Sequence, residues 1–151
     1  MKTSINEFYI IGIAIRTTNQ DGQGAKDIPM LWEKFIAENI TAQIPGKLCN
    51  DIYCVYTEYE GDYTQPYTTV IGYRVESLES VPGGLTGVTI PGGSYRIFTA
   101  EGKLSDGIVI NAWNTIWNTP VNRSYTADFE VYSSDNRNPD NTEVNIYIGV
   151  K

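Results

Sequence analysis

The same order of elements occurs twice along the chain, and this repetition is the feature that most constrains the fold. Each copy has the order strand, helix, strand, strand, with the repeats expected over residues 5–78 and 85–151. A chain of 151 residues is long enough to form one domain with a buried core. We therefore predict a single α+β domain over residues 1–151. In this domain, a duplicated β-α-β-β unit forms an antiparallel sheet with two main helices and a central ligand-binding crevice.

Alternating apolar and polar residues indicate the strands, and apolar stripes at helical spacing indicate the helices. Asp27 is a suitable N-cap for the first helix, and Pro29 is acceptable in its first turn. A bend is expected at Pro91-Gly92-Gly93, and a turn at residues 134–141. The predicted strands are 7–17, 51–59, 67–76, 85–100, 125–133 and 143–150, and the predicted helices are 27–38 and 106–118.

The sequence pattern of residues 127–132 indicates a strand with one buried face. Its alternation places Phe129 and Val131 on one face and Glu130 and Tyr132 on the other. A carboxylate on a strand commonly points to solvent, which is one interpretation of Glu130. The other is that Glu130 and Tyr132 face a cleft and bind something cationic or aromatic.

Comparison of the two copies bears on this choice. Superposing the third element of each copy places Tyr132 on Tyr56 and Glu130 on Cys54. A symmetric scaffold needs no carboxylate at this position, so the copies have diverged in chemistry there. This favours a functional role for Glu130.

Composition excludes several kinds of function. The net charge of −7 argues against nucleic acid as a direct partner, because neutralising phosphates requires clustered Lys and Arg. The chain has no His, which removes Ser-His-Asp and Cys-His nucleophiles and most zinc sites. Cys49 and Cys54 do not form a metal-type pair, so we expect neither a metal nor a cofactor. No secretion signal or membrane-length apolar segment is found, so we expect a cytoplasmic protein without a membrane partner.

The chain resembles the GyrI-like small-molecule-binding domain, which is the effector-binding domain of AraC-type and related transcription activators. The similarity covers nearly the whole chain and depends on an ordered set of stretches. These are 51–59 with 67–75, 90–95 (IPGGSY), 112–117 (AWNTIW), 129–132 (FEVY) and 144–148 (VNIYI). The resemblance implies a duplicated α+β fold with an aromatic-lined pocket. In such domains a buried glutamate matching Glu130 meets the positive charge of lipophilic cations.

The resemblance also implies further pocket residues. Tyr67, Trp113 and Tyr147 correspond to pocket walls, and Tyr95 and Tyr132 are further candidates. Trp117 lies one position beyond the apolar stripe of its helix and is expected to lean towards the crevice. For each of these residues, the alternative is an ordinary core or surface aromatic.

Three functions remain open. The first is a non-enzymatic pocket for lipophilic or cationic aromatic molecules in a stand-alone sensor, because the predicted strands leave no room for the helix-turn-helix domain usual in the family. The second is a hydrolase of electrophilic small molecules, with Glu130 as the general base. The third is a protein-interaction module of the gyrase-inhibitor type, which would bind a protein partner through an exposed acidic face.

Overall fold

The computed structural model describes residues 2–61, 65–133 and 142–151, so the predicted turn at residues 134–141 lies outside the described residues. In the described part of the chain, eight strands form one antiparallel sheet in the order β1-β6-β8-β7-β3-β4-β2-β5. The strands are β1 (Lys2–Ile5), β2 (Phe8–Thr17), β3 (Ile52–Thr57), β4 (Tyr67–Val75), β5 (Thr86–Ile90), β6 (Gly93–Gly102), β7 (Arg123–Tyr132) and β8 (Thr142–Val150). The helices are α1 (Gln23–Ala37), α2 (Ile40–Gln43) and α3 (Ile108–Trp117). The predicted α+β class and antiparallel sheet are confirmed.

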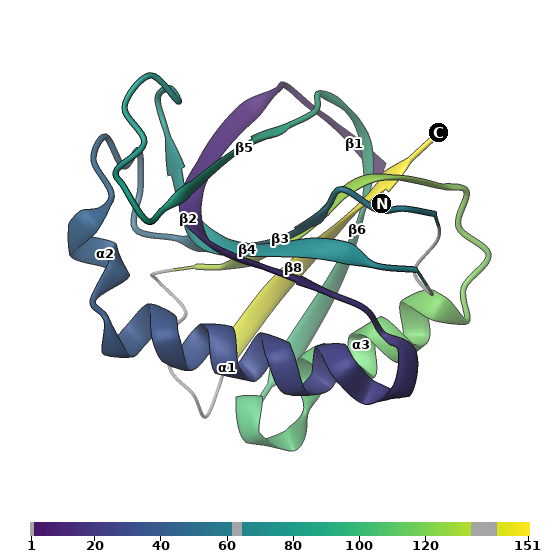
Figure 1. Ribbon diagram of the computed structural model, residues 1–151. Helices are drawn as coiled ribbons and strands as arrows, with labels where there is room; N and C mark the ends of the chain where they lie inside the picture. Colours follow the sequence, from purple (N-terminus) through teal and green to yellow (C-terminus); the bar gives the residue numbers. More distant parts are fainter. Residues whose placement is uncertain (1, 62–64, 134–141) are drawn as a thin grey trace.

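The sheet is curled, and the two longer helices lie on one side of it. Figure 1 shows α1 and α3 below the sheet, while β1, β2 and β5 curve upwards and away from them. The strands between these two regions therefore have one face towards the helices and one face towards the inside of the curl.

The strand order is symmetric about the boundary between β7 and β3. On one side lie β3, β4 and β2, and on the other lie their counterparts β7, β8 and β6. The short strand that begins each half joins the opposite half: β1 pairs with β6, and β5 pairs with β2. The predicted unit lacked β1, whose four residues are too few to show a clear alternation. The predicted strand 85–100 is divided into β5 and β6 at the expected bend.

Both long helices begin after a glycine in the left-handed conformation. Gly22 precedes α1 with φ 72°, and Gly107 precedes α3 with the same angle. Glycine adopts this conformation without the steric cost that a side chain would add. The predicted start of the first helix at Asp27 is wrong, because α1 begins four residues earlier, at Gln23. Asp27 is not the N-cap; its carboxylate accepts hydrogen bonds from the side chains of Thr17 and Gln23.

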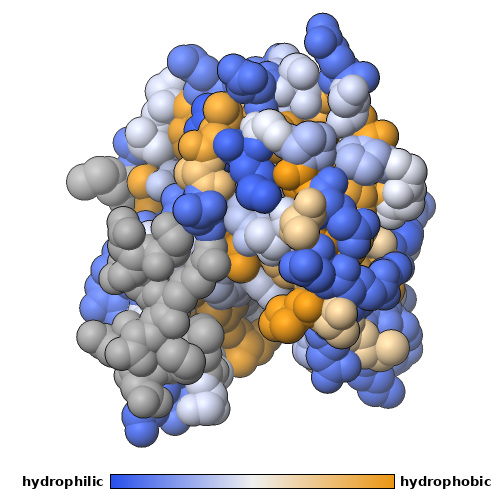
Figure 2. Space-filling model, turned by 90° about the vertical axis from the view of Figure 1, so that its left-hand side faces the viewer, coloured by the Kyte–Doolittle hydropathy of each residue, from blue (hydrophilic) through white to orange (hydrophobic). Residues whose placement is uncertain are grey.

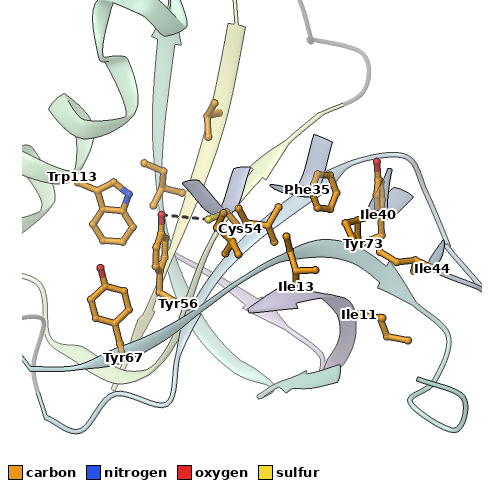
Figure 3. Packing of buried hydrophobic residues seen from close by; sticks show 14 of the residues in the cluster. Ile11, Ile13, Phe35, Ile40, Ile44, Cys54, Tyr56, Tyr67, Tyr73 and Trp113 are labelled. Carbon is orange, nitrogen blue, oxygen red and sulfur yellow. Dashed lines mark hydrogen bonds between the residues drawn. The ribbon is translucent and has the colours of Figure 1, made fainter. Parts of the chain in front are cut away.

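Each face of the sheet carries its own apolar core. Residues such as Ile11, Ile13 and Phe35 form the core between the sheet and the helices (Figure 3). Residues such as Phe8 and Phe129 form the second core, within the curl. The alternation predicted for the strand at 127–132 is therefore confirmed, because Phe129 belongs to the inner core whereas Glu130 faces the helices.

Two glycines allow β2 and β4 to approach closely. Gly12 in β2 and Gly72 in β4 are directly opposite each other in the antiparallel register. A Cβ atom on Gly12 would lie 2.0 Å from the carbonyl oxygen of Ile71, and one on Gly72 would lie 2.1 Å from that of Ile11. No side chain fits in this space, so glycine is required at both positions.

Candidate ligand-binding site

A cavity of about 830 Å³ lies on the helix side of the sheet and is bordered by α1 and α3. This volume falls within the range of roughly 300–1,000 Å³ that is typical of small-molecule sites. Seen from the side, the lower part of the molecule, where the helices lie, is hollowed and exposes hydrophobic residues (Figure 2). The apolar wall comes mainly from the two helices: Ile28, Pro29 and Trp32 from α1, and Val109, Ile110, Trp113 and Trp117 from α3.

Glu130 lies in the wall of this cavity and is only 1% exposed. Its carboxylate accepts three hydrogen bonds from three different elements. Tyr56 Oη in β3 and Trp113 Nε1 in α3 donate to Oε2 over 2.8 and 2.6 Å. Tyr132 Oη, two residues further along β7, donates to Oε1 over 2.7 Å. The carboxylate is therefore held in one orientation by groups that are far apart in the sequence.

No cationic side chain among the described residues pairs with Glu130. The two ion pairs in this part of the chain are Arg16 with Glu60 and Arg123 with Asp128. Burial raises the pKa of Glu130, whereas the hydrogen bonds from Tyr132, Trp113 and Tyr56 act in the opposite direction. The cavity wall thus contains a desolvated carboxyl group whose charge, when ionised, is not balanced by a neighbouring cation.

Aromatic rings surround this carboxyl group. The ring centroids of Tyr56 and Trp113 are 5.3 Å apart at an angle of 83°. Those of Trp32 and Tyr132 are 5.0 Å apart at 73°. Such edge-to-face packing stabilises the wall. All three tryptophans of the chain line the cavity.

The pseudosymmetry of the sheet explains how this site is built. Glu130 and Cys54 are directly opposite each other on β7 and β3, the two central strands. The superposition of the two copies matches these residues, and it also matches Tyr132 with Tyr56. Both tyrosines donate to the same carboxylate. Cys54, in contrast, is a fully buried free thiol whose pKa is raised well above its usual value, mainly by burial.

A buried ion pair lies next to Glu130 on β7. Asp128, two residues before Glu130 on β7, is fully buried, and its Oδ2 accepts a hydrogen bond from Arg123 Nη2 over 2.6 Å. Tyr59 Oη also donates to Oδ2, and the backbone N–H of Gly149 donates to Oδ1. Burial raises the pKa of Asp128, and the charge of Arg123 opposes this effect. This pair is not predicted from the sequence, although the alternation that places Glu130 towards the helices applies equally to Asp128.

Five of the seven predicted site residues line the cavity: Glu130, Tyr67, Trp113, Trp117 and Tyr132. Tyr67 has a pKa raised to about 12, chiefly by burial, and its hydroxyl donates to Asn19 Oδ1 over 2.7 Å. Figure 3 shows the side chains of Tyr56, Tyr67 and Trp113 close together. Among the aromatic lining residues, Trp32, Tyr56 and Tyr59 were not predicted. In the superposition of the two copies, Tyr56 matches Tyr132, which is a predicted site residue. This match could have identified Tyr56.

Tyr95 and Tyr147 belong to the other face of the sheet, which corrects the expectation that they line the same pocket. Tyr95 is buried in the inner core, and its hydroxyl donates to the carbonyl oxygen of Pro91 over 2.7 Å. The ring of Tyr147 stacks on Phe129 with centroids 4.7 Å apart and an angle of 10°. The reason is the alternation of β8, where Ile146 and Ile148 point towards the helices and Tyr147 points away.

Within the described ranges, no group of three or more His, Cys, Asp or Glu side chains is arranged to hold a metal ion. In the same part of the chain, no helix has the length and apolar character needed to cross a membrane. The chemistry available in the cavity is thus that of a buried carboxyl group, a paired arginine and aromatic rings.

A family model supplies the identification. The model of Cass2, described as an integron-associated effector-binding protein, matches residues 3–150. The chain belongs to the Cass2 family. The predicted resemblance to GyrI-like effector-binding domains is therefore confirmed.

Individual relatives agree with this assignment. The Cass2-family chain is 28% identical over 144 residues to YobU of Bacillus subtilis (strain 168), a proposed transcriptional regulator; the match spans 93% of this chain and 90% of YobU. The structure of the present chain resembles that of an integron cassette protein from the mobile metagenome of Vibrio cholerae, with a TM-score of 0.78 and 30% identity. That likeness covers 100% of this chain and 95% of the other. A likeness of fold extends to SAV2435 bound to tetraphenylphosphonium, with a TM-score of 0.79, 15% identity, and coverage of 100% and 93%.

Proposed function

We propose that this Cass2-family protein binds a lipophilic aromatic cation as an effector, with Glu130 as the counter-charge. The observation that carries the proposal is the carboxyl group of Glu130, which is buried in an aromatic cavity without a cationic partner among the described residues. A buried ionised carboxylate is costly unless it is paired. A cationic guest removes that cost, so the pairing gains more free energy than it would in water.

The aromatic rings favour the same class of ligand. Ring faces attract cations by about 0.5–2 kcal/mol each, and they also bury the apolar surface of the guest. Trp113, Trp117, Tyr67 and Tyr132 are assigned as walls of the binding site, in addition to Tyr56. The likeness to SAV2435, whose structure contains tetraphenylphosphonium, supports a cation of this kind.

The hydrogen bonds to Glu130 prepare the site before the ligand arrives. Three donors fix the position of the carboxylate and stabilise its ionised form. The ligand then does not need to reorganise the group that it pairs with, which lowers the free-energy cost of binding. This arrangement suits a binding pocket. By analogy with YobU, the bound ligand is expected to act as a signal in transcriptional control, received by a protein partner in the cytoplasm.

Tetraphenylphosphonium is a suitable probe because its charge does not depend on pH. We expect saturable quenching of tryptophan fluorescence in the wild-type protein, since all three tryptophans line the cavity. Glu130→Gln keeps the size of the side chain but removes its charge, and it should weaken binding by at least about tenfold. Isothermal titration calorimetry measures the dissociation constants directly.

Two controls make this test specific. Tyr147→Phe removes a hydroxyl group on the opposite face of the sheet and should leave the affinity unchanged. Triphenylphosphine oxide, a neutral arylphosphorus compound, should bind Glu130→Gln as well as it binds the wild type. Equal affinity of the cation for the wild type and Glu130→Gln would refute the proposed role of Glu130.

A further inference from the structure

Arg123 lies in the cavity wall and has donors that no group satisfies. The residue is 7% exposed, and its Nη2 donates to Asp128 Oδ2 over 2.6 Å. Its Nε and Nη1 atoms are closed off from solvent and have no hydrogen-bond partner in the described part of the chain. Buried guanidinium N–H groups without an acceptor are costly, so such groups usually meet a ligand or an ordered water molecule.

The backbone around Arg123 is shaped to place it there. The pairing of β7 with β8 shifts register between Arg123, which pairs with Val150, and Asp128, which pairs with Ile148. Tyr125, inside this segment, has φ 54°, a left-handed conformation that is unfavourable for an aromatic residue. Register irregularities and strained residues of this kind concentrate near functional sites, where they direct a side chain. Here the guanidinium lies over the ring of Tyr125, 4.4 Å from its centroid.

Trp113 connects this group with Glu130. Its indole N–H donates to Glu130 Oε2, and its ring centroid lies 5.9 Å from the guanidinium carbon of Arg123. The carboxyl group and the guanidinium therefore contact the same indole and line the same cavity. A ligand in this cavity would lie near both groups.

Charge balance indicates what kind of ligand group Arg123 would bind. Its positive charge is compensated by Asp128, whose two oxygens accept hydrogen bonds from Arg123, Tyr59 and Gly149. An additional anion at this place would leave a buried excess of negative charge. A neutral oxygen, such as that of a carbonyl group, accepts hydrogen bonds from the free N–H groups without adding charge.

We propose that Arg123 is a second polar contact of the cavity, which binds the carbonyl oxygen of a ligand whose cationic aromatic part lies at Glu130. This inference rests on the proposed function and narrows the ligand class to aromatic cations that carry a neutral hydrogen-bond acceptor. Arg123 is then a specificity-determining residue, because it distinguishes between cations that have such an acceptor and cations that lack it.

Matched phosphonium probes test this proposal. A triphenylphosphonium cation with a 4-oxopentyl or 5-oxohexyl tail carries a ketone, and its partner carries a methylidene group in place of the oxygen. Of the two ketones, the one that the wild-type protein binds more tightly should bind at least about fivefold more tightly than its methylidene partner. In the double variant Arg123→Met with Asp128→Asn, which removes both charges together, this ratio should fall to about one. The double variant should still bind the methylidene probe, because Glu130 is intact.

The outcomes separate this inference from the proposed function. Arg96→Met, which removes an arginine that lies over Phe98, is the matched control and should keep the wild-type ratio. Thermal unfolding verifies that the double variant is folded. If it is not, Tyr125→Gly replaces it; this variant removes the ring that supports the guanidinium and should lower the ratio. Equal binding of ketone and methylidene probes by the wild type would overturn the role of Arg123 alone. Tighter binding of a matched carboxylate probe would overturn the neutral acceptor, and binding of none of the cations would overturn both proposals.

Discussion

The hydroxyl group of Tyr56 offers a sharp test of how the site holds its charge. Tyr56→Phe removes one oxygen atom and keeps the buried ring in place. The lost hydrogen bond, 2.8 Å from Tyr56 Oη to Glu130 Oε2, is one of three that favour the ionised carboxylate. A hydrogen bond to a charged group contributes about 1.5–3 kcal/mol. Its removal therefore raises the pKa of Glu130 further above its usual value.

The pH dependence of cation binding reports this change. Only the ionised form of Glu130 attracts the cation, so affinity falls as the pH falls through the pKa of this group. We expect the midpoint of this loss to lie at least about one pH unit higher in Tyr56→Phe than in the wild type. Titrations of tetraphenylphosphonium at a series of pH values measure both midpoints, and the phosphonium charge itself does not titrate. Tyr147→Phe is the control, with an unchanged midpoint.

An unchanged midpoint in Tyr56→Phe would refute this reasoning. It would mean that the remaining donors, Trp113 and Tyr132, compensate fully, or that the affinity does not depend on the charge of Glu130. Trp113→Phe removes the other hydrogen bond to Oε2 and separates these two explanations. A shift in that variant indicates compensation, whereas no shift in either variant contradicts the electrostatic account.

Two further predictions concern stability. Because burial raises the pKa of Glu130 above its usual value of 4.5, the free energy of unfolding falls as the pH rises from that value through the raised pKa. Glu130→Gln should therefore raise the melting temperature more at about pH 8 than at about pH 4. A difference in melting temperature that stays constant across this range would contradict this. Gly12→Ala should lower the free energy of unfolding by about 1–3 kcal/mol or more, since its methyl group would meet the carbonyl oxygen of Ile71. Urea unfolding measures the loss, and Gly83→Ala, where a Cβ meets nothing within 4 Å, is the control.

Local patterns were sufficient to predict most of the elements and the face of the sheet on which Glu130 lies. The alternation along β7 separated Glu130 from Phe129, and the repeat placed Cys54 opposite Glu130 in the alignment. The structure then pairs the same two residues across β3 and β7. These inferences succeeded because they depend on the period of a strand and on the order of elements, both of which are written in adjacent residues.

The remaining features depend on contacts between distant segments. Nothing near Tyr147 shows that its neighbours Ile146 and Ile148, and not Tyr147 itself, face the helices. The partnership of Arg123 with Asp128 depends on a register shift between β7 and β8 and on a left-handed Tyr125, which no simple alternation predicts. Strand β1 was not predicted because it is short and because it pairs with β6, which belongs to the other half of the chain.

The pairing of Glu130 with Cys54 across the centre of the sheet has a consequence for how such a site can arise. If two identical half-length chains formed this sheet as a dimer, both central positions would have to carry the same residue. Two glutamates directly opposite each other would repel at close range, and two cysteines would offer no counter-charge. A single chain containing both halves escapes this restriction, because each position can change alone. The cavity can therefore hold one unshared negative charge and, with it, a guest in one defined orientation.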